Sequence, residues 1–309
     1  MRRCALLACA AAALAGLMGC GLGPGEEQPG VGVDLRVTRD FGQQLLSSKN
    51  ALKIREDETV MRLLKGSADV ETRFGGGFVQ AIDGLSGKGG GGRSDWFFYV
   101  NGIEADEGAA DYELSPGDVV QWDYRDWGET VNARATVGAF PQPFAGGSNG
   151  KRFPVRIECE DVDSSPCATV KQRLRRAGVP VTSSSLGTTG NQRVARVVVA
   201  DWGRARELPS TRIVELGPAR SGIFARFVED GTALELLDAD GDTVRTVRAG
   251  FGLLAAMRPT DTELVWLVTG VDDAGVAAAA DAFGARSTRD SFAIATSGGE
   301  PVELPIGAR

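Results

Sequence analysis

Histidine and cysteine are the residue types that decide which chemistry this chain of 309 residues can perform. Histidine, the usual general base beside a Ser or Cys nucleophile and the commonest metal ligand, does not occur in the sequence. Ser-His-Asp catalysis, Cys-His catalysis and most zinc sites are therefore excluded. An exported hydrolase that acts through paired carboxylates does not need histidine, but no such pair stands out among the acidic residues of the sequence. We therefore expect a protein that is not an enzyme and that carries no metal or cofactor.

The first cysteines of the sequence belong to a targeting segment. Arg2 and Arg3 precede an apolar run, residues 5–17, that contains Cys9. This run is shorter than the roughly 20 residues that a membrane-spanning helix needs. We therefore expect residues 1–19 to be a signal peptide and not a permanent anchor.

Cys20 follows the apolar run at a site of small residues. The stretch Leu17-Met18-Gly19-Cys20 resembles the lipobox of bacterial lipoproteins. That resemblance implies that Cys20 is lipidated and becomes the mature N-terminus, and ordinary cleavage beside an incidental cysteine is the alternative. Residues 20–30, rich in Gly, Pro and Glu, are expected to form a lipidated tether. The expected location is the extracytoplasmic face of the cell membrane, to which Cys20 anchors the chain.

Cys159 and Cys167 are the remaining cysteines, eight residues apart. In an exported protein this spacing favours a disulfide over a redox or metal site, because a CxxC pair is missing. Two buried thiols are the alternative. The chain also has 34 basic against 41 acidic residues, and its acidic balance argues against nucleic acid as a partner.

Strand patterns dominate the first half of the chain. Residues 31–39 alternate between apolar and polar side chains, and residues 58–64 after Asp57, a candidate N-cap, predict a short helix. Two further strands are expected at 96–100 and 119–124. The motifs here are WFFYVNG at 96–102, Gly108-Ala109, Tyr112, Pro116-Gly117-Asp118 and VVQWDY at 119–124.

These motifs, in this order, resemble the transcobalamin C-terminal-like domain, over about residues 33–127. The family has no assigned function of its own and occurs in bacterial surface proteins and in the β-domain of cobalamin carriers. The resemblance implies a β-grasp fold, in which a mixed sheet grips one helix. The carriers hold a corrinoid between this domain and a large helical barrel, and the present sequence lacks the repeats of such a barrel.

Four residues of this region are candidates for ligand binding. Trp96 and Trp122 are expected to be mainly core residues. Tyr and Trp side chains outside the core combine a large apolar area with a polar group and suit a flat ligand or a partner. The candidates are Tyr99, Asn101, Tyr124 and Trp127.

A change in pattern divides the chain into domains. Apolar periodicity fades over residues 129–150, which predicts a linker between a β-grasp-like domain at 31–128 and a mixed α/β domain at 151–309. The expected fold class is thus α+β. Within the second domain, strands are expected at 155–159, 194–200 and 264–269, and helices at 168–178 and 273–283. Residues 238–242, DADGD, fit a hairpin turn better than a calcium loop.

These observations leave two functions of different classes. The first is a membrane-anchored envelope lipoprotein, not an enzyme, whose β-grasp domain binds a small amphipathic ligand such as a corrinoid, for example cobalamin. The second is a cell-surface module that docks another envelope protein or a polymer through its aromatic face. An aromatic cleft between the domains would favour the first function, and an open aromatic face would favour the second.

Overall fold

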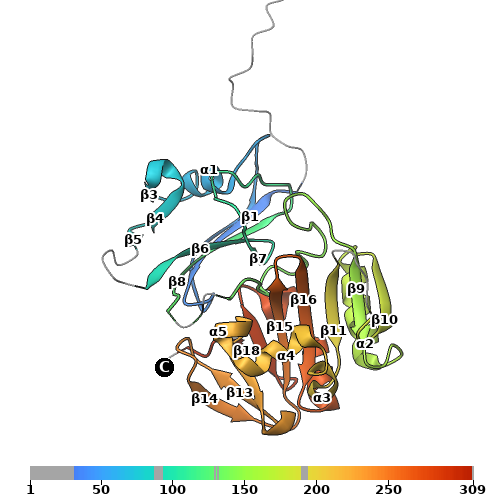
Figure 1. The fold of residues 1–309 in the computed structure, drawn as a ribbon. Coiled ribbons are helices and arrows are strands. Elements are labelled where there is room, and N and C mark those ends of the chain that lie inside the picture. Colours follow the sequence, from blue (N-terminus) through green and yellow to red (C-terminus); the bar gives the residue numbers. More distant parts are fainter. Residues whose placement is uncertain (1–30, 87–92, 129, 131, 189–193, 308–309) are drawn as a thin grey trace, which may run out of the picture.

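The computed structural model describes residues 31–86, 93–128, 130, 132–188 and 194–307. The predicted signal peptide, the predicted lipidation site Cys20 and the predicted tether lie outside these ranges. None of the helices within them is long and apolar enough to cross a membrane. The fold is α+β, as predicted, with separate groups of strands in the two halves of the chain (Figure 1).

The N-terminal domain is built on a five-stranded sheet with the order β2-β1-β8-β6-β7. Its strands are β1 (Val33–Arg39), β2 (Gln44–Leu52), β6 (Ser94–Val100), β7 (Ile103–Glu104) and β8 (Val119–Asp126). The central strands β1 and β8 run parallel, and the other pairs are antiparallel. One face of this mixed sheet packs on helix α1 (Val60–Lys65), which is the β-grasp arrangement.

Helix α1 is short because residues next to it fix both its start and its end. The Thr59 side chain accepts a hydrogen bond from the backbone N–H of Arg62 at 3.3 Å. Thr59 is therefore the N-cap, and the expected cap at Asp57 is wrong. Gly66 ends the helix.

A small antiparallel sheet follows helix α1. It is formed by β3 (Val70–Arg73), β4 (Phe78–Ile82) and β5 (Leu85–Ser86), with the 3-10 turn η1 (Phe74–Gly76) between the first two strands.

The C-terminal domain is built on a seven-stranded sheet with the order β10-β9-β11-β16-β15-β17-β18. Its parallel part contains β9 (Val155–Cys159), β10 (Val181–Ser185), β11 (Ala195–Val199) and β16 (Glu263–Gly270). Its antiparallel part adds β15 (Gly252–Thr260), β17 (Ala293–Thr296) and β18 (Val302–Leu304). Both faces of the central strands are buried, which explains the continuous apolar runs in their sequences.

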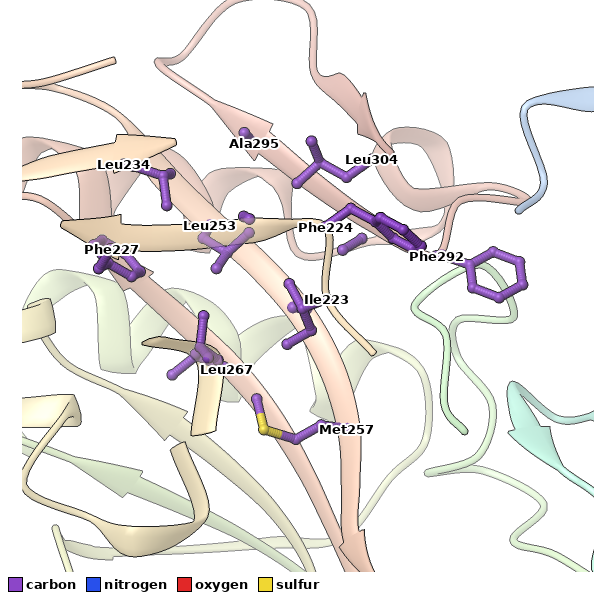
Figure 2. Close-up of a cluster of buried hydrophobic side chains, with 14 of the residues drawn as sticks. Ile223, Phe224, Phe227, Leu234, Leu253, Met257, Leu267, Phe292, Ala295 and Leu304 are labelled. Atoms are coloured by element: carbon purple, nitrogen blue, oxygen red, sulfur yellow. The ribbon is translucent and has the colours of Figure 1, made fainter. Parts of the chain in front are cut away.

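Different elements cover the two faces of this sheet. Helices α2 (Ser165–Arg176) and α6 (Asp273–Ala282) pack on the face that contains Trp266, and α7 (Ala285–Thr288) follows α6. The other face, which contains Leu267, is covered by residues 202–247 (Figure 2). This covering segment consists of α3 (Trp202–Ala205), α4 (Pro209–Arg212), η2 (Ile213–Leu216), α5 (Pro218–Ser221), β12 (Ala225–Val228), η3 (Glu229–Gly231), β13 (Ala233–Leu237) and β14 (Thr243–Val247).

The connection between the two sheets is packed against both of them. The side chains of Ala135, Val137 and Phe144 are buried with the C-terminal core. Ala135 also forms a β-bridge with Ile103 of the N-terminal sheet. Residues 133–147 therefore connect the sheets as part of the packed interior and not as an exposed tether. Their buried apolar residues follow no helix or strand period because the segment forms neither element.

Candidate functional site

The four residues predicted to bind a ligand do not form one surface. Tyr99 lies on the face of the N-terminal sheet that meets the C-terminal domain. Tyr124, which pairs with Trp96, lies on the opposite face, toward α1. Successive side chains of a strand point to opposite faces, so these two tyrosines cannot share a platform. The predicted aromatic platform is therefore wrong.

Tyr99 is fully buried between the two domains. Its hydroxyl donates a hydrogen bond to the carbonyl of Ala133 and accepts one from Nη1 of Arg125, both at 2.5 Å. Burial raises the pKa of Tyr99, because a phenolate would lose its hydration. The Arg125 guanidinium is itself enclosed by aromatic rings, with Cζ 4.1 to 5.5 Å from the ring centroids of Phe41, Phe97, Tyr99 and Phe292. These aromatic rings thus pack around Arg125 at the junction between the domains.

Asn101 has a structural role at the turn after β6. Its side-chain amide donates to Oδ1 of Asp118 at 2.7 Å and to the carbonyl of Gly147 at 2.9 Å, and its Oδ1 accepts from the backbone of Val119. Asn101 is almost completely buried and adopts a φ of 58°, a left-handed conformation that Asn tolerates better than most residues. The expectation that it orients a ligand group is wrong, because its polar atoms are occupied within the chain.

Of the other two predicted residues, Tyr124 lies near the end of β8, the middle strand of the sheet, and Trp127 directly follows that strand. The Tyr124 hydroxyl donates to the carbonyl of Ser86, and its ring packs 5.2 Å from that of Trp96. Trp127 is 37% exposed. Of the four candidates, Trp127 has the most exposed side chain.

A cleft of about 360 Å³ lies where the two domains meet, and we call it the junction cleft. Its apolar wall is formed by Ile103, Phe153, Val194, Ala195 and Leu264. Its polar lining is formed by Asp106, Ser148, Asn149, Lys151, Arg152, Arg258, Asp261, Thr262 and Glu263. Both domains and the connecting segment contribute to this lining, so the cleft exists only when the domains are packed together.

Arg258 of β15 holds one side of the junction cleft to the N-terminal domain. Its guanidinium binds both carboxylate oxygens of Asp106, at 3.1 and 2.8 Å, and the carbonyls of Glu104 and Asp261. The hydrogen bond from Arg258 lowers the pKa of Asp106, which favours the charged carboxylate. Arg134 adds a second cation, 2.7 Å from Asp261. These ion pairs fix the shape of the cleft.

Lys151 and Arg152 line the same cleft with exposed side chains. Neither forms an ion pair with the part of the chain that the structure describes. The carboxylates of the cleft are by contrast paired, since Glu263 binds Arg196 at 2.6 Å. The cleft therefore has an apolar wall and two cations that can attract an anionic group.

A second hollow, of about 420 Å³, lies at the carboxyl ends of β9 and β11. The chain leaves β9 toward β10 on one side, while β11 lies on the other side, and such a point in an α/β sheet is a common ligand position. Its acidic lining consists of Glu160, Asp161, Asp201 and Asp273. Burial and the neighbouring Asp201 carboxylate raise the pKa of Glu160. This negative charge disfavours the anions that helix N-termini usually bind.

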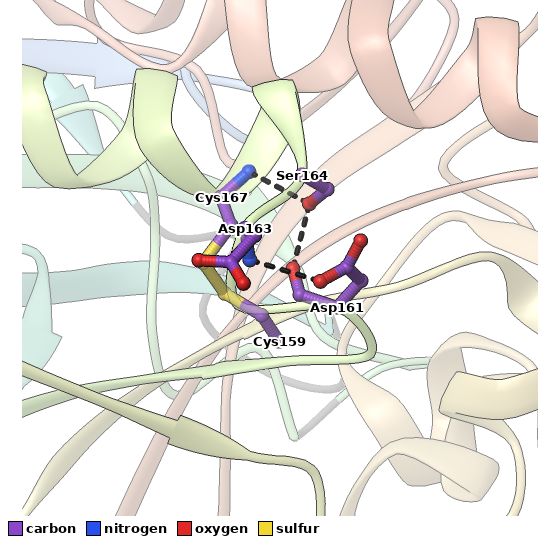
Figure 3. Close-up of a disulfide and its surroundings, with 5 residues drawn as sticks. All are labelled: Cys159, Asp161, Asp163, Ser164 and Cys167. Carbon is purple, nitrogen blue, oxygen red and sulfur yellow. Dashed lines mark hydrogen bonds between the residues drawn. A yellow bond between two sulfur atoms is a disulfide. The ribbon is translucent and has the colours of Figure 1, made fainter.

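The predicted disulfide between Cys159 and Cys167 closes the loop beside this acidic hollow (Figure 3). Ser164 caps α2 by accepting from the backbone of Cys167, and Asp161 accepts from the backbone of Asp163. These acidic and hydroxyl groups are thus used to stabilise the loop.

The other acidic segment, residues 238–242, forms the predicted hairpin turn between β13 and β14. Oδ1 of Asp238 accepts from the backbone of Asp240 at 3.0 Å and of Asp242 at 2.9 Å. Within the described ranges, no group of three or more Cys, Asp or Glu side chains is arranged to hold a metal ion.

The patterns in the sequence did not predict the junction cleft. Lys151 and Arg152 follow a segment expected to be a linker, and Arg258 lies in β15, a strand that was not predicted. The apolar run before Arg258 could have been used to predict that strand. Nothing in the sequence, however, pairs Arg258 with Asp106, which lies 152 positions earlier.

Comparisons with known proteins add a domain assignment. Residues 57–126 match the family model described as Domain of unknown function (DUF4430). No curated protein matches the chain. A solved structure of a candidate metal-binding protein from Ruminococcus gnavus is similar to 33% of this chain over 97% of its own length, with 16% sequence identity and a TM-score of 0.24.

Proposed function

We propose that this protein is an envelope lipoprotein that binds a small amphipathic molecule in the junction cleft and does not act as an enzyme. The observation that supports this function best is the cleft itself. It lies between two domains that are held together by paired charges, and it combines an apolar wall with the cations Lys151 and Arg152. Pockets of this composition are typical of small-molecule sites.

The volume of the cleft narrows the class of ligand. Small-molecule pockets span roughly 300 to 1,000 Å³, so about 360 Å³ is at the lower end of that range. The resemblance of residues 33–127 to the cobalamin-carrier domain supports a corrinoid ligand. The volume favours a smaller molecule with an apolar body and a carboxylate or phosphate group, since a corrinoid macrocycle would extend well beyond the cleft.

The charge pairing of the cleft supports binding without catalysis. Acid-base hydrolysis needs two carboxylates in different protonation states near the substrate. Here Asp106 and Asp261 bind Arg258 and Arg134, and Glu263 binds Arg196. These partners occupy the carboxylates. Together with the lack of histidine, this pairing argues against a hydrolase.

A direct search for the ligand tests this proposal. Native mass spectrometry of the protein purified from its host should show a bound small molecule. Thr262→Trp fills the cleft from an exposed position, and we expect it to lower ligand recovery by about tenfold or more. Thr243→Trp, an exposed position on β14, is the matched control and should retain the ligand.

Two results would contradict ligand binding in the cleft. One is equal recovery of the molecule from Thr262→Trp and from the control. The other is the absence of any bound molecule, together with no detectable binding of added cobalamin. The second result would favour the surface interaction module.

The membrane anchor is tested separately in the host. Cys20→Ala should release the protein from the membrane fraction or leave an unprocessed precursor. Cys9→Ala, within the signal peptide, should leave both processing and membrane attachment unchanged. A Cys20→Ala protein that is correctly cleaved and remains membrane-bound would overturn the lipoprotein assignment.

A further inference from the structure

The β3–β4 hairpin presents two aromatic rings to solvent. Phe74 is 87% exposed and Phe78 is 40% exposed, and their ring centroids lie 6.3 Å apart in a T-shaped arrangement. The turn between them is Gly75-Gly76-Gly77, and the first two glycines adopt φ values of 71° and 100°. No side chain in this turn covers the rings. We call this element, residues 70–82, the aromatic hairpin.

The exposure of these rings is not explained by the fold. Phe74 takes a left-handed conformation with φ 52°, which is unusual for a bulky residue. Neither ring belongs to the hydrophobic core on α1, although Val79 of the same hairpin does. Paired exposed aromatic residues mark contact with a partner or a membrane more often than isolated ones do.

The position of the hairpin in the molecule favours a membrane as the partner. In Figure 1 the hairpin, α1 and the start of β1 lie at the end of the molecule opposite the C-terminal sheets. The chain before β1 leads to Cys20, and residues 21–30 lie between that cysteine and Val31. Ten residues span at most roughly 35 Å when fully extended. A lipid on Cys20 therefore keeps this end of the molecule close to the bilayer.

The charge around the hairpin is compatible with an anionic membrane. Residues 44–82 contain six basic and five acidic side chains, whereas the whole chain has a net charge of −7. Arg73, directly before Phe74, is exposed. This stretch thus lacks the excess of negative charge that would repel anionic lipid headgroups.

We propose that the aromatic hairpin inserts Phe74 and Phe78 into the interfacial region of the bilayer that anchors Cys20. The inference rests on the membrane-anchoring part of the proposed function. The lipid supplies attachment, and the two rings supply a second contact that orients the domains on the membrane. In this orientation the C-terminal domain points away from the bilayer.

The test attaches the chain to vesicles through an artificial anchor, so that it does not depend on lipidation in the cell. The mature chain, residues 20–309, is coupled through Cys20 to maleimide lipids in phosphatidylethanolamine/phosphatidylglycerol vesicles. Cys159 and Cys167 are disulfide-bonded and do not compete. Phe74→Trp reports insertion through quenching by brominated lipids, and Leu216→Trp, at a position 60% exposed in the C-terminal domain, is the control.

We expect Phe74→Trp to add fluorescence that brominated lipids quench, and Leu216→Trp to add fluorescence that they do not quench. Equal quenching of the two added tryptophans, or no quenching at position 74, would overturn the proposal.

A second experiment measures how the chain partitions onto vesicles when it is not coupled to lipid. Phe74→Ser/Phe78→Ser should lower this partition by about tenfold or more, because each buried Phe contributes a large transfer free energy. Leu216→Ser/Val244→Ser should not change it, and equal partition of both double variants would also overturn the proposal. If Cys20→Ala does not release the protein from the membrane in the host, that result contradicts the lipid anchor. Insertion of the aromatic hairpin is then still decided by the vesicle experiments.

Discussion

Arg36 of β1 and Asp290 after α7 form an ion pair between the two domains, with Nη1 2.7 Å from Oδ1. The same Nη1 donates to the carbonyl of Gly138 in the connecting segment. One arginine thus contacts the N-terminal sheet, the connecting segment and the C-terminal domain. Arg36 therefore contributes to the contact between the two domains.

The Arg36–Asp290 pair should contribute measurably to stability. Its side chains are only 9% and 15% exposed, so Arg36→Met, which leaves Asp290 unpaired, should cost about 3 kcal/mol. A double-mutant cycle with Asp290→Asn, measured by urea denaturation, should give a coupling energy of about 1 to 3 kcal/mol. Arg39→Met, which breaks the exposed pair with Asp40, is the control and should change stability by less than about 0.5 kcal/mol. A coupling energy near zero would contradict the role of the pair.

Tyr99→Phe tests whether the Tyr99 hydroxyl is structural. Its removal breaks the buried hydrogen bonds to the Ala133 carbonyl and from Nη1 of Arg125, which should cost about 1 to 3 kcal/mol. Tyr124→Phe removes a hydroxyl whose hydrogen bond to Ser86 is exposed, and it should cost less than about 1 kcal/mol. Thermal and urea unfolding compare the two variants. Equal losses would show that the buried network around Arg125 contributes little.

The acid sensitivity of the fold should depend on Glu158. Burial raises the pKa of this carboxyl, but hydrogen bonds and charge from Arg196 and Arg156 outweigh that effect, so the pKa is lowered from its ordinary value of 4.5. The unfolded chain then binds the proton more readily than the folded chain. Glu158 therefore stabilises the fold above about pH 4.5, and this contribution is lost as the pH falls further.

Glu158→Gln should remove that contribution. We expect a loss of about 3 kcal/mol at pH 7, because two arginines lose their buried partner, and a smaller decrease of stability between pH 5 and pH 3 than in the wild type. Urea titrations at several pH values measure both effects. Glu207→Gln, which affects an exposed pair with Arg204, should leave the pH profile unchanged. An unchanged profile in Glu158→Gln would show that other carboxyls determine the acid sensitivity.

The disulfide should stabilise the loop before α2. Cys159→Ala/Cys167→Ala opens a short loop, which should cost roughly 2 to 3 kcal/mol through the entropy of the unfolded chain. Melting of the double variant should not change on addition of a reductant, whereas reduction should lower the melting temperature of the wild type. A wild type whose melting temperature is insensitive to complete reduction would contradict this prediction.

Much of the local structure could be predicted from the sequence. The patterns at 155–159 and 264–269 correspond closely to β9 and β16, because a strand alternates with period 2 or, when both faces are buried, is apolar throughout. Two of the strands that the sequence did not predict, β2 and β10, lie at sheet edges, where exposed faces permit polar residues such as Ser and Thr.

The sequence by itself determined which side chains share a face of each strand. Alternation separates Tyr99 from Trp96, and it does so in any fold that contains this strand. Likewise, the spacing of Cys159 and Cys167 favoured the disulfide that the structure contains.

Only the tertiary structure decided what covers each face and where a cleft remains. The Tyr99 face is buried because the C-terminal domain packs on it, through contacts such as the one from Gln121 to the Asp290 carbonyl, 169 positions away. The junction cleft depends in the same way on Arg258 meeting Asp106. Such contacts follow from how two complete domains pack against each other, and no local pattern of residues encodes that packing.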